Sequence, residues 1–329
     1  MGGDYAPQNV VAGALEALRE SNNRFEVVFV GQESLIRSHL QSSSGERLSY
    51  LIVHAADIID MHDGATAALK QKKDSSIGIG MTMHKEGKVD AFVSAGHTGA
   101  MVSASTIILG RLEGVSRPTI GAFLPSEKGV CLLLDAGANV DCRPQHLFEF
   151  AIMGSIYAKE MFNFPNPSIG LLNVGEEESK GNEVVKETHK LLSKSNLNFI
   201  GNVEGRDILS GKAQVVVCDG FVGNIVLKFG ESVPSFIKNR LKEFFNKNLF
   251  FKLMGGMMRN SLRTVFKSMD YEEHGGVPIL GVKGVAIIGH GKSTPKAIKN
   301  MILKAEETVR KQINERIQEA LLNQVLIER

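Results

Sequence analysis

Short aliphatic runs alternate with amphipathic segments along almost the whole chain. The runs lie at residues 25–31, 48–55, 90–96, 129–137, 168–175, 214–220 and 283–291. Nearly every run ends in Gly or Asp-Gly directly before a helix-like stretch, which is typical of βαβ units in a parallel sheet. We therefore predict an α/β protein with a doubly wound, mostly parallel sheet that has helices on both faces. Ligands of such sheets bind outside the carboxyl ends of the strands, so the loops after these runs are the candidate site loops.

No segment rich in Pro, Gly or Ser divides the 329 residues, so we predict a single domain over 1–329. The chain is 43% hydrophobic and its formal net charge is only +2, which excludes a disordered chain. The same low charge gives no chain-wide basic field for nucleic acid, and we expect no such partner. The three cysteines are widely spaced without a histidine cluster, so we expect no disulfide framework and no metal site.

The first residues, MGGDYAP, have neither the basic flank nor the apolar core of a signal peptide. The longest apolar stretch, 277–288, is much shorter than the roughly 20 residues that span a bilayer. We therefore expect a cytoplasmic protein. MGGDYAP is also an unusual chain start, because a Gly-Gly-Asp turn that leads into a helix normally follows a strand in an α/β unit.

A different pattern occupies residues 233–270. Apolar side chains follow helical spacing on both sides of Gly255-Gly256, which predicts an amphipathic helical hairpin with a break at these glycines. Between residues 238 and 267 there are eight basic side chains and one acid, so this segment carries +7 and the rest of the chain −5. The residues alone leave three partners open: a neighbouring helix or second subunit, an acidic protein, and an anionic membrane.

Two glycine-rich loops follow predicted strands and suit anion binding. GHGKS at 289–293 is not a nucleotide-binding Walker A loop, because Ala286 stands where the first glycine is needed. It predicts either a general anion cradle or an ordinary helix start, with Ser293 as the cap in both cases. SAGHTGA at 94–100 lacks the GxGxxG dinucleotide fingerprint, and it offers His97 and Thr98 as side-chain donors.

Three further loops combine small and charged residues. The loops 135–144 and 218–224 each have an acid at a strand end, Asp135 and Asp219, and continue with small residues and an Asn. Their backbone N–H groups suit a phosphate or an oxyanion, although Asp135 and Asp219 as helix caps explain the pattern equally well. In the acidic loop 176–183, Lys180 is a candidate phosphate contact.

Taken in order, the motifs resemble those of the phosphate acyltransferases of bacterial phospholipid synthesis, which move a fatty acyl group from acyl carrier protein to inorganic phosphate. The motifs are MGGDYAP, SAGHTGA, RPTIGAFLPS, LLDAGANVDC, LLNVGEEESKGNE, VEGRDILSGKAQVVVCDGFVGN, GVPILGVKGVAIIGHGKS and PKAIKN, and they span nearly the whole chain. The resemblance implies a fold like those of the phosphotransacetylases and the isocitrate or isopropylmalate dehydrogenases. It also implies a homodimer without a cofactor, metal or nucleotide.

The sequence departs from the family pattern in a few places. His97 stands where Asn is usual, Lys292 where a small residue is usual, and Gln214 where Asp is usual. Family members begin with a short strand before MGGD, so the resemblance implies that this chain lacks its first strand.

The resemblance assigns the chemistry to the glycine loops. It implies direct attack of phosphate on the thioester, which needs no GxSxG nucleophile because a thiol with a pKa of about 8.5 leaves readily. The catalytic candidates are His97, Thr98, Asn224 and Lys180. The candidates for binding substrate or phosphate are Gly3, Asp4, Gly96, Gly99, Asp135, Gly137, Asn139, Gly181, Asp219, Gly220, Gly223, His290, Gly291 and Ser293. We expect Asp135 and Asp219 to shape loops rather than to transfer protons.

The resemblance also favours acyl carrier protein and the membrane as partners of the basic segment. It implies peripheral attachment to the cytoplasmic membrane and makes a membrane glycerol-phosphate acyltransferase a further candidate partner. The predicted contact residues are Arg240, Lys247, Phe250, Phe251, Lys252, Leu253, Met254, Arg259 and Arg263. Two rival functions are a β-decarboxylating dehydrogenase of similar fold and a non-catalytic membrane scaffold.

Overall fold

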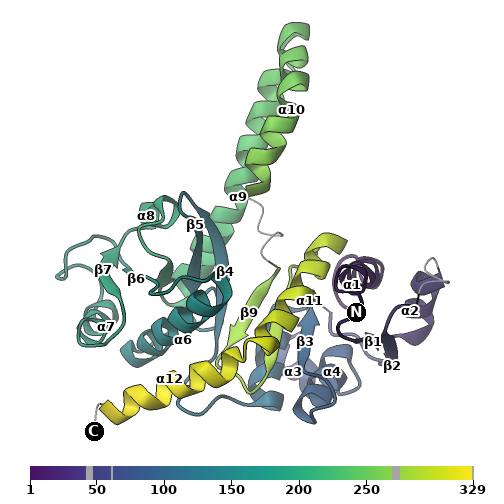
Figure 1. Ribbon diagram of the computed structural model, residues 1–329, viewed down its shortest axis with the longest axis horizontal. Helices are drawn as coiled ribbons and strands as arrows, with labels where there is room; N and C mark the ends of the chain where they lie inside the picture. The colour runs from purple at the N-terminus through teal and green to yellow at the C-terminus, as the bar shows by residue number, and fades with distance from the viewer. Residues whose placement is uncertain (42–46, 61, 269–274, 328–329) are drawn as a thin grey trace.

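The computed structural model describes residues 1–41, 47–60, 62–268 and 275–327. In these residues the strands form two sheets (Figure 1). The smaller sheet pairs β1 (Val27–Gly31) with β2 (Tyr50–His54) in parallel. The larger sheet consists of β3 (Ala91–Ser94), β4 (Thr119–Ser126), β5 (Gly129–Leu134), β6 (Ile169–Leu172), β7 (Phe199–Val203), β8 (Val215–Val217), β9 (Val277–Leu280) and β10 (Val285–Ile288). Its order is β3-β10-β9-β4-β5-β8-β6-β7.

The predicted α/β class and mostly parallel pairing are confirmed, but the centre of the large sheet is antiparallel. The pairs β10–β9, β9–β4 and β4–β5 are antiparallel, and the other four pairs are parallel. Each of the seven predicted runs contains a strand, whereas β4, β7 and β9 were not predicted. Only residues 127–128 connect β4 to β5, and a connection this short allows only an antiparallel pair.

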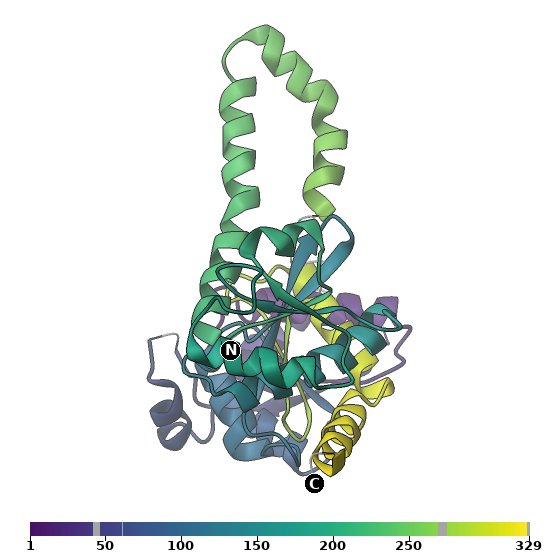
Figure 2. The same ribbon diagram turned by 90° about the vertical axis from the view of Figure 1, so that its left-hand side faces the viewer.

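Helices cover both faces of the large sheet (Figures 1 and 2). They are α1 (Gln8–Glu20), α2 (Glu33–Leu40), α3 (Ala65–Gln71), α4 (Ser76–Lys85), α5 (Thr98–Ala104), the π-helix η2 (Ser105–Leu109), α6 (Pro144–Phe162), α7 (Glu183–Ser193), α8 (Gly205–Ser210), α9 (Gly220–Phe245), α10 (Leu249–Ser268), α11 (Pro295–Arg310) and α12 (Ile313–Ile327). Among the described residues, no helix is both long enough and apolar enough to cross a membrane.

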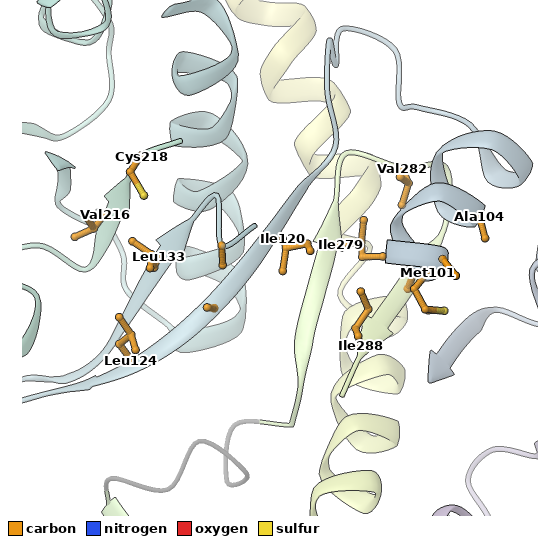
Figure 3. Packing of buried hydrophobic residues seen from close by; sticks show 14 of the residues in the cluster. Met101, Ala104, Ile120, Leu124, Leu133, Val216, Cys218, Ile279, Val282 and Ile288 are labelled. Carbon is orange, nitrogen blue, oxygen red and sulfur yellow. The ribbon is translucent and has the colours of Figure 1, made fainter. Parts of the chain in front are cut away.

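The strand β5 shows how the core is divided between the two faces. Cys131 and Leu133 belong to the cluster that includes residues of α4 and α5, and Leu132 and Leu134 belong to the cluster built with α6 and α12. Figure 3 shows Leu133 in the first cluster together with side chains from the neighbouring strands. Both faces of β5 are therefore buried, which explains why its sequence is continuously apolar rather than alternating.

The helices α9 and α10 project together from the body of the molecule (Figure 2). The predicted break at Gly255-Gly256 is wrong, because both glycines lie inside α10 and the chain turns at residues 246–248. Gly255 instead permits close packing, since a Cβ there would be 2.7 Å from Cγ of Phe245. The first helix also begins earlier than predicted, at Gly220, and residues 269 and 270 of the predicted hairpin lie outside the described residues.

The two sheets are separated by a cavity of about 670 Å³ between β1 and β3. Its walls include both of these strands, the start of α1 and the side chain of Met1. The α-amino group of Met1 is buried, and this burial lowers its pKa. The implied absence of a first strand stays a prediction.

Candidate functional site

Three of the predicted loops meet at Gly3. The backbone N–H of Asp4 donates to the carbonyl oxygen of Gly291 at 2.9 Å. A Cβ on Gly3 would lie 2.7 Å from the carbonyl oxygen of Ala95 and 3.4 Å from that of Gly291. Only glycine lets the three backbones approach this closely. The loops MGGD, SAGHTGA and GHGKS therefore form one group, which we call the Gly3 junction.

His97 in this group caps a helix. Its Nδ1 accepts from the backbone N–H of Ala100 at 3.1 Å, and its Nε2 lies 3.0 Å from the carbonyl oxygen of Asp63. A neutral imidazole with Nε2 protonated satisfies both contacts and has no donor left for an oxyanion. The carboxylate of Asp63 is paired with Lys72, and this contact lowers the pKa of Asp63. Thr98, the first residue of α5, is exposed.

The predicted capping role of Ser293 is wrong. Thr294 caps α11 by accepting from the N–H of Ala297, and the buried Ser293 hydroxyl donates to the carbonyl oxygen of His290 at 2.6 Å. The hydroxyl proton of Ser293 is therefore used inside the loop. The imidazole of His290 is exposed, and its Nδ1 accepts from the N–H of Lys292 at 3.3 Å.

A second group forms around the buried carboxylate of Asp135. Its Oδ1 accepts from the N–H groups of Ile120 and Ala138, and its Oδ2 accepts from the backbone and side-chain N–H groups of Asn139. Burial raises the pKa of Asp135, whereas these four donors favour its ionised form. Asp135 thus organises the loop that follows β5 and caps no helix, because α6 begins later, after Arg143.

The loop after β8 packs directly on this carboxylate loop. The N–H of Gly220 donates to the carbonyl oxygen of Asn139 at 2.7 Å, and a Cβ on Gly223 would overlap the carbonyl oxygen of Asp135. Asn224 lies beside Gly137, since a Cβ on that glycine would be 3.4 Å from Cβ of Asn224. Asp219 is the N-cap of α9, where it accepts from the N–H of Val222 at 2.9 Å. The helix-cap interpretation of Asp219 is confirmed.

Lys180 lies in a third loop. It is exposed, and its carbonyl oxygen accepts from Nδ2 of Asn173 at 3.2 Å. The next residue, Gly181, has a φ of +89°, and a Cβ there would overlap Asn173. In the part of the chain that the structure describes, no hydrogen bond or ion pair joins the Lys180 side chain to the other two groups.

The strand directions keep the first two groups apart. Because β10–β9, β9–β4 and β4–β5 are all antiparallel, β10 and β5 run in opposite directions. The Gly3 junction follows the carboxyl ends of β3 and β10, and the Asp135 group follows those of β5 and β8. The Gly3 junction and the Asp135 group therefore lie at opposite ends of the sheet, and Lys180 and Gly181 lie in a separate loop after β6.

A cavity of about 350 Å³ adjoins the Asp135 group. Its walls come from the end of α5, from η2, from residues 111–118 and from Ala138 and Asn139. Two arginines, Arg111 and Arg117, line it, and we call it the arginine cavity. Sequence reasoning did not single out either arginine. The available signals were the spacing of the two arginines, six residues apart, and the position of Arg117 as the first residue of the motif RPTIGAFLPS.

The three cysteines are free, and burial makes their thiols poor nucleophiles. Burial raises the pKa of Cys131 to about 12 and that of Cys218 well above its ordinary value. Burial, followed by the charge of Asp135, raises the pKa of Cys142 to about 12. No group of three or more candidate metal ligands occurs within the described ranges.

Comparison with known proteins decides the family. A model of the family described as "fatty acid synthesis protein" matches residues 1–316. A phosphate acyltransferase from Chlorobaculum parvum is 48% identical over 326 residues, which cover 96% of each chain. A phosphate acyltransferase from Dictyoglomus turgidum is 46% identical, with 98% of this chain and 96% of the relative covered. This chain belongs to the phosphate acyltransferase family. It is therefore an acyltransferase.

Solved structures show the same fold for the phosphate acyltransferase chain. A phosphotransacetylase from Streptococcus pyogenes matches with a TM-score of 0.60 and 17% identity, over 93% of both chains. A phosphotransacetylase from Staphylococcus aureus matches with a TM-score of 0.55 and 15% identity, over 91% of this chain and 99% of that one. The predicted phosphotransacetylase fold is confirmed, and the likeness to isocitrate-type dehydrogenases stays a prediction.

Proposed function

We propose that this acyltransferase moves a long-chain acyl group from the thioester of acyl carrier protein to inorganic phosphate. A phosphate oxygen forms a bond to the thioester carbonyl carbon, and the bond from that carbon to sulfur breaks. The products are an acyl phosphate and the carrier thiolate, which takes up a proton from solvent. Family membership is the observation that carries the proposal, because the relatives are named for acyl transfer with phosphate.

The state of the cysteines supports direct attack by phosphate. An acyl-enzyme intermediate on cysteine needs a thiolate, and a thiol with a pKa near 12 is ionised to about one part in ten thousand at pH 8. Cys131 and Cys142 both have such a pKa. The one contact between a serine hydroxyl and an imidazole among the described hydrogen bonds, Ser193 with His189 at 3.4 Å, lies on α7 far along the chain from the glycine loops. Phosphate itself is therefore the simplest nucleophile.

We infer which side chains donate to the thioester oxyanion from the contacts that each candidate already makes. His97 uses Nδ1 to cap α5 and Nε2 to contact the carbonyl oxygen of Asp63, so we assign the role to Asn224 and Thr98. Asn224 is only partly buried beside Gly137, so its side-chain amide is accessible as a donor. Donors of this kind stabilise the tetrahedral intermediate as negative charge develops.

The charge of α10 supports an acidic carrier protein as donor. At 100° per residue, Lys252, Arg259 and Arg263 fall on one stripe of the helix, and all three are exposed. Acyl carrier proteins are acidic, and opposite charges on two partners accelerate their encounter. We place the docking surface of the carrier on this stripe.

An apolar stripe lies next to the basic one and supports membrane attachment. Leu249, Phe250, Leu253 and Met257 are all at least two-thirds exposed. Basic charge beside exposed apolar side chains is typical of helices that lie in an anionic membrane surface. Of the other predicted contact residues, Phe251 packs against Phe244 with ring centroids 4.7 Å apart. Its ring therefore joins the start of α10 to the end of α9. We also propose that the protein forms a homodimer. The proposed recipient of its acyl phosphate product is a membrane glycerol-phosphate acyltransferase.

One assay tests the reaction. The protein is incubated with palmitoyl acyl carrier protein with and without phosphate, and thioester loss and acyl phosphate are followed by mass spectrometry. We expect loss that depends on phosphate and that iodoacetamide at pH 8 does not inhibit, because the thiols are protonated. Turnover that depends on a nicotinamide nucleotide instead would favour the dehydrogenase, and no turnover of either kind would favour the scaffold.

A further inference from the structure

The arginine cavity is lined by positively charged side chains. Its walls contain two guanidinium groups, from Arg111 and Arg117, and no acidic side chain. Neither arginine forms an ion pair with a carboxylate in the described ranges. Both arginines are exposed, and a planar guanidinium is the side chain that most often recognises carboxylate and phosphate groups. Two of them on the wall of one cavity favour an anionic ligand.

The segment that carries the two arginines is held rigidly. The buried carboxylate of Glu149, on α6, accepts from the N–H of Ser116 at 2.8 Å and from its hydroxyl at 2.7 Å. Arg111 donates to the carbonyl oxygen of Ser116, and Asn139 donates to that of Pro118 at 2.8 Å. These contacts fix the backbone on both sides of Arg117. Arg117 itself makes no hydrogen bond or ion pair among the described residues, so its guanidinium is available to a ligand.

The remaining walls suit a small polar ligand. Ser103 and Thr106 add hydroxyl groups, and Ile107 adds an apolar edge that is 61% exposed at the mouth. Thr106 and Ile107 belong to the π-helix η2, and such helices occur frequently at functional sites. The volume of about 350 Å³ lies within the range of small-molecule sites.

We propose that the arginine cavity binds a phosphate group, with Arg117 as its main contact and Arg111 as a second. The cavity adjoins the Asp135 group through Ala138 and Asn139, so a phosphate there lies next to the loop in which Gly137 contacts Asn224, the proposed oxyanion donor. The ligand class does not depend on the proposed function, but the origin of the phosphate does. It is either inorganic phosphate, as the nucleophile, or the phosphodiester in the prosthetic arm of the acyl carrier protein.

Binding of inorganic phosphate tests the cavity directly. We expect Arg117→Gln to raise the dissociation constant, measured by isothermal titration calorimetry, at least about tenfold, because a charge-assisted bidentate contact is lost. Arg117→Lys keeps the charge, and we expect its dissociation constant for phosphate to lie between those of the parent protein and Arg117→Gln. The midpoint of thermal unfolding should not change, because Arg117 makes no described contact. The control is Arg37→Gln on α2, which removes another exposed arginine, one paired with Glu33, and should not alter phosphate affinity.

Kinetics separate the two sources of phosphate. If inorganic phosphate is the ligand, Arg117→Gln raises the KM for phosphate and not that for the acyl donor. If the phosphodiester is the ligand, Arg117→Gln raises the KM for acyl carrier protein. The same substitution should not raise the KM for an acyl N-acetylcysteamine thioester, which has no phosphodiester. Unchanged phosphate affinity together with unchanged KM values overturns the proposal. If the parent protein transfers no acyl group but phosphate binding still falls in Arg117→Gln, the proposed function fails and the cavity remains a phosphate site.

Discussion

The carboxylate of Asp135 is fully buried and is the acceptor for four N–H groups from three residues. Asp135→Asn replaces one acceptor oxygen with an NH₂ group that faces N–H donors whichever way it is turned. We expect the free energy of unfolding to fall by about 2–4 kcal/mol, the cost of leaving buried donors without acceptors. Urea denaturation followed by circular dichroism measures this change.

The neighbouring exposed Asp141 provides the control for Asp135. Asp141→Asn should change stability by less than about 0.5 kcal/mol, as surface substitutions usually do. Equal stability of Asp135→Asn and the parent would mean that Asp135 is already protonated in the folded protein. In that case the effect of burial on its pKa would outweigh the four donors.

His97 allows a helix-capping role to be separated from a catalytic one. His97→Ala removes the contacts to Ala100 and Asp63 and should lower stability by about 1 kcal/mol, whereas His97→Asn keeps a side chain that caps well. If His97 only caps, the value of kcat/KM well below the unfolding temperature stays close to the parental value in both variants. A large fall in kcat for His97→Asn without a loss of stability would instead assign the imidazole to the reaction.

At the scale of elements, adjacent glycines in α10 make a matched pair. A Cβ on Gly256 would have no neighbour within 4 Å, but one on Gly255 would press on the ring of Phe245 in α9. We expect Gly256→Ala to stabilise α10 by about 1 kcal/mol through helix propensity. Gly255→Ala should separate the tips of α9 and α10. Hydrogen exchange of α10 should slow in the first variant and quicken in the second, and quickening in both would contradict the packing role of Gly255.

These glycines also show where sequence patterns stop being informative. Gly-Gly within a helical pattern predicts a break, yet here it serves close packing between α9 and α10, which depends on a residue ten positions away. In the same way either Ser293 or Thr294 suits a helix cap, and only the start of α11 at Pro295 decides between them. The strand β5 was predictable because a continuous apolar run leaves few alternatives, whereas β4, which is also buried, was missed because Thr, Gly and Pro interrupt its apolar residues.

The topology of the whole molecule was less predictable than its elements. Loop sequences showed which residues suit anion binding, but the sequence pattern does not reveal strand direction. The antiparallel centre formed by β9 and β4 therefore separates the Gly3 junction from the Asp135 group, which the sequence placed in one site. Arg117 begins the motif RPTIGAFLPS, but its role was missed because only the fold brings it together with Arg111 and Asn139 around one cavity.

At the same scale, charge is distributed unevenly. A nearly neutral chain carries +7 between residues 238 and 267, on the helices that project from the body (Figure 2). If this charge attracts an acidic donor, reversing Lys252, Arg259 and Arg263 to Glu should raise the KM for acyl carrier protein about tenfold at low ionic strength. The KM for a small acyl thioester should not change. The effect should fade toward 1 M salt, where the screening length is about 3 Å.

Two control variants test whether the effect depends on where the charge lies. Reversing Lys186, Lys190 and Lys194 on and after α7 causes the same change in net charge away from the projecting helices, and it should leave the KM for the carrier near parental. Replacing Leu249, Phe250 and Leu253 with Ser keeps the charge and removes the apolar stripe. That variant should bind vesicles containing phosphatidylglycerol more weakly while it keeps its KM for the carrier. If both reversals raise the KM equally, steering comes from net charge alone, and if neither does, the carrier docks elsewhere.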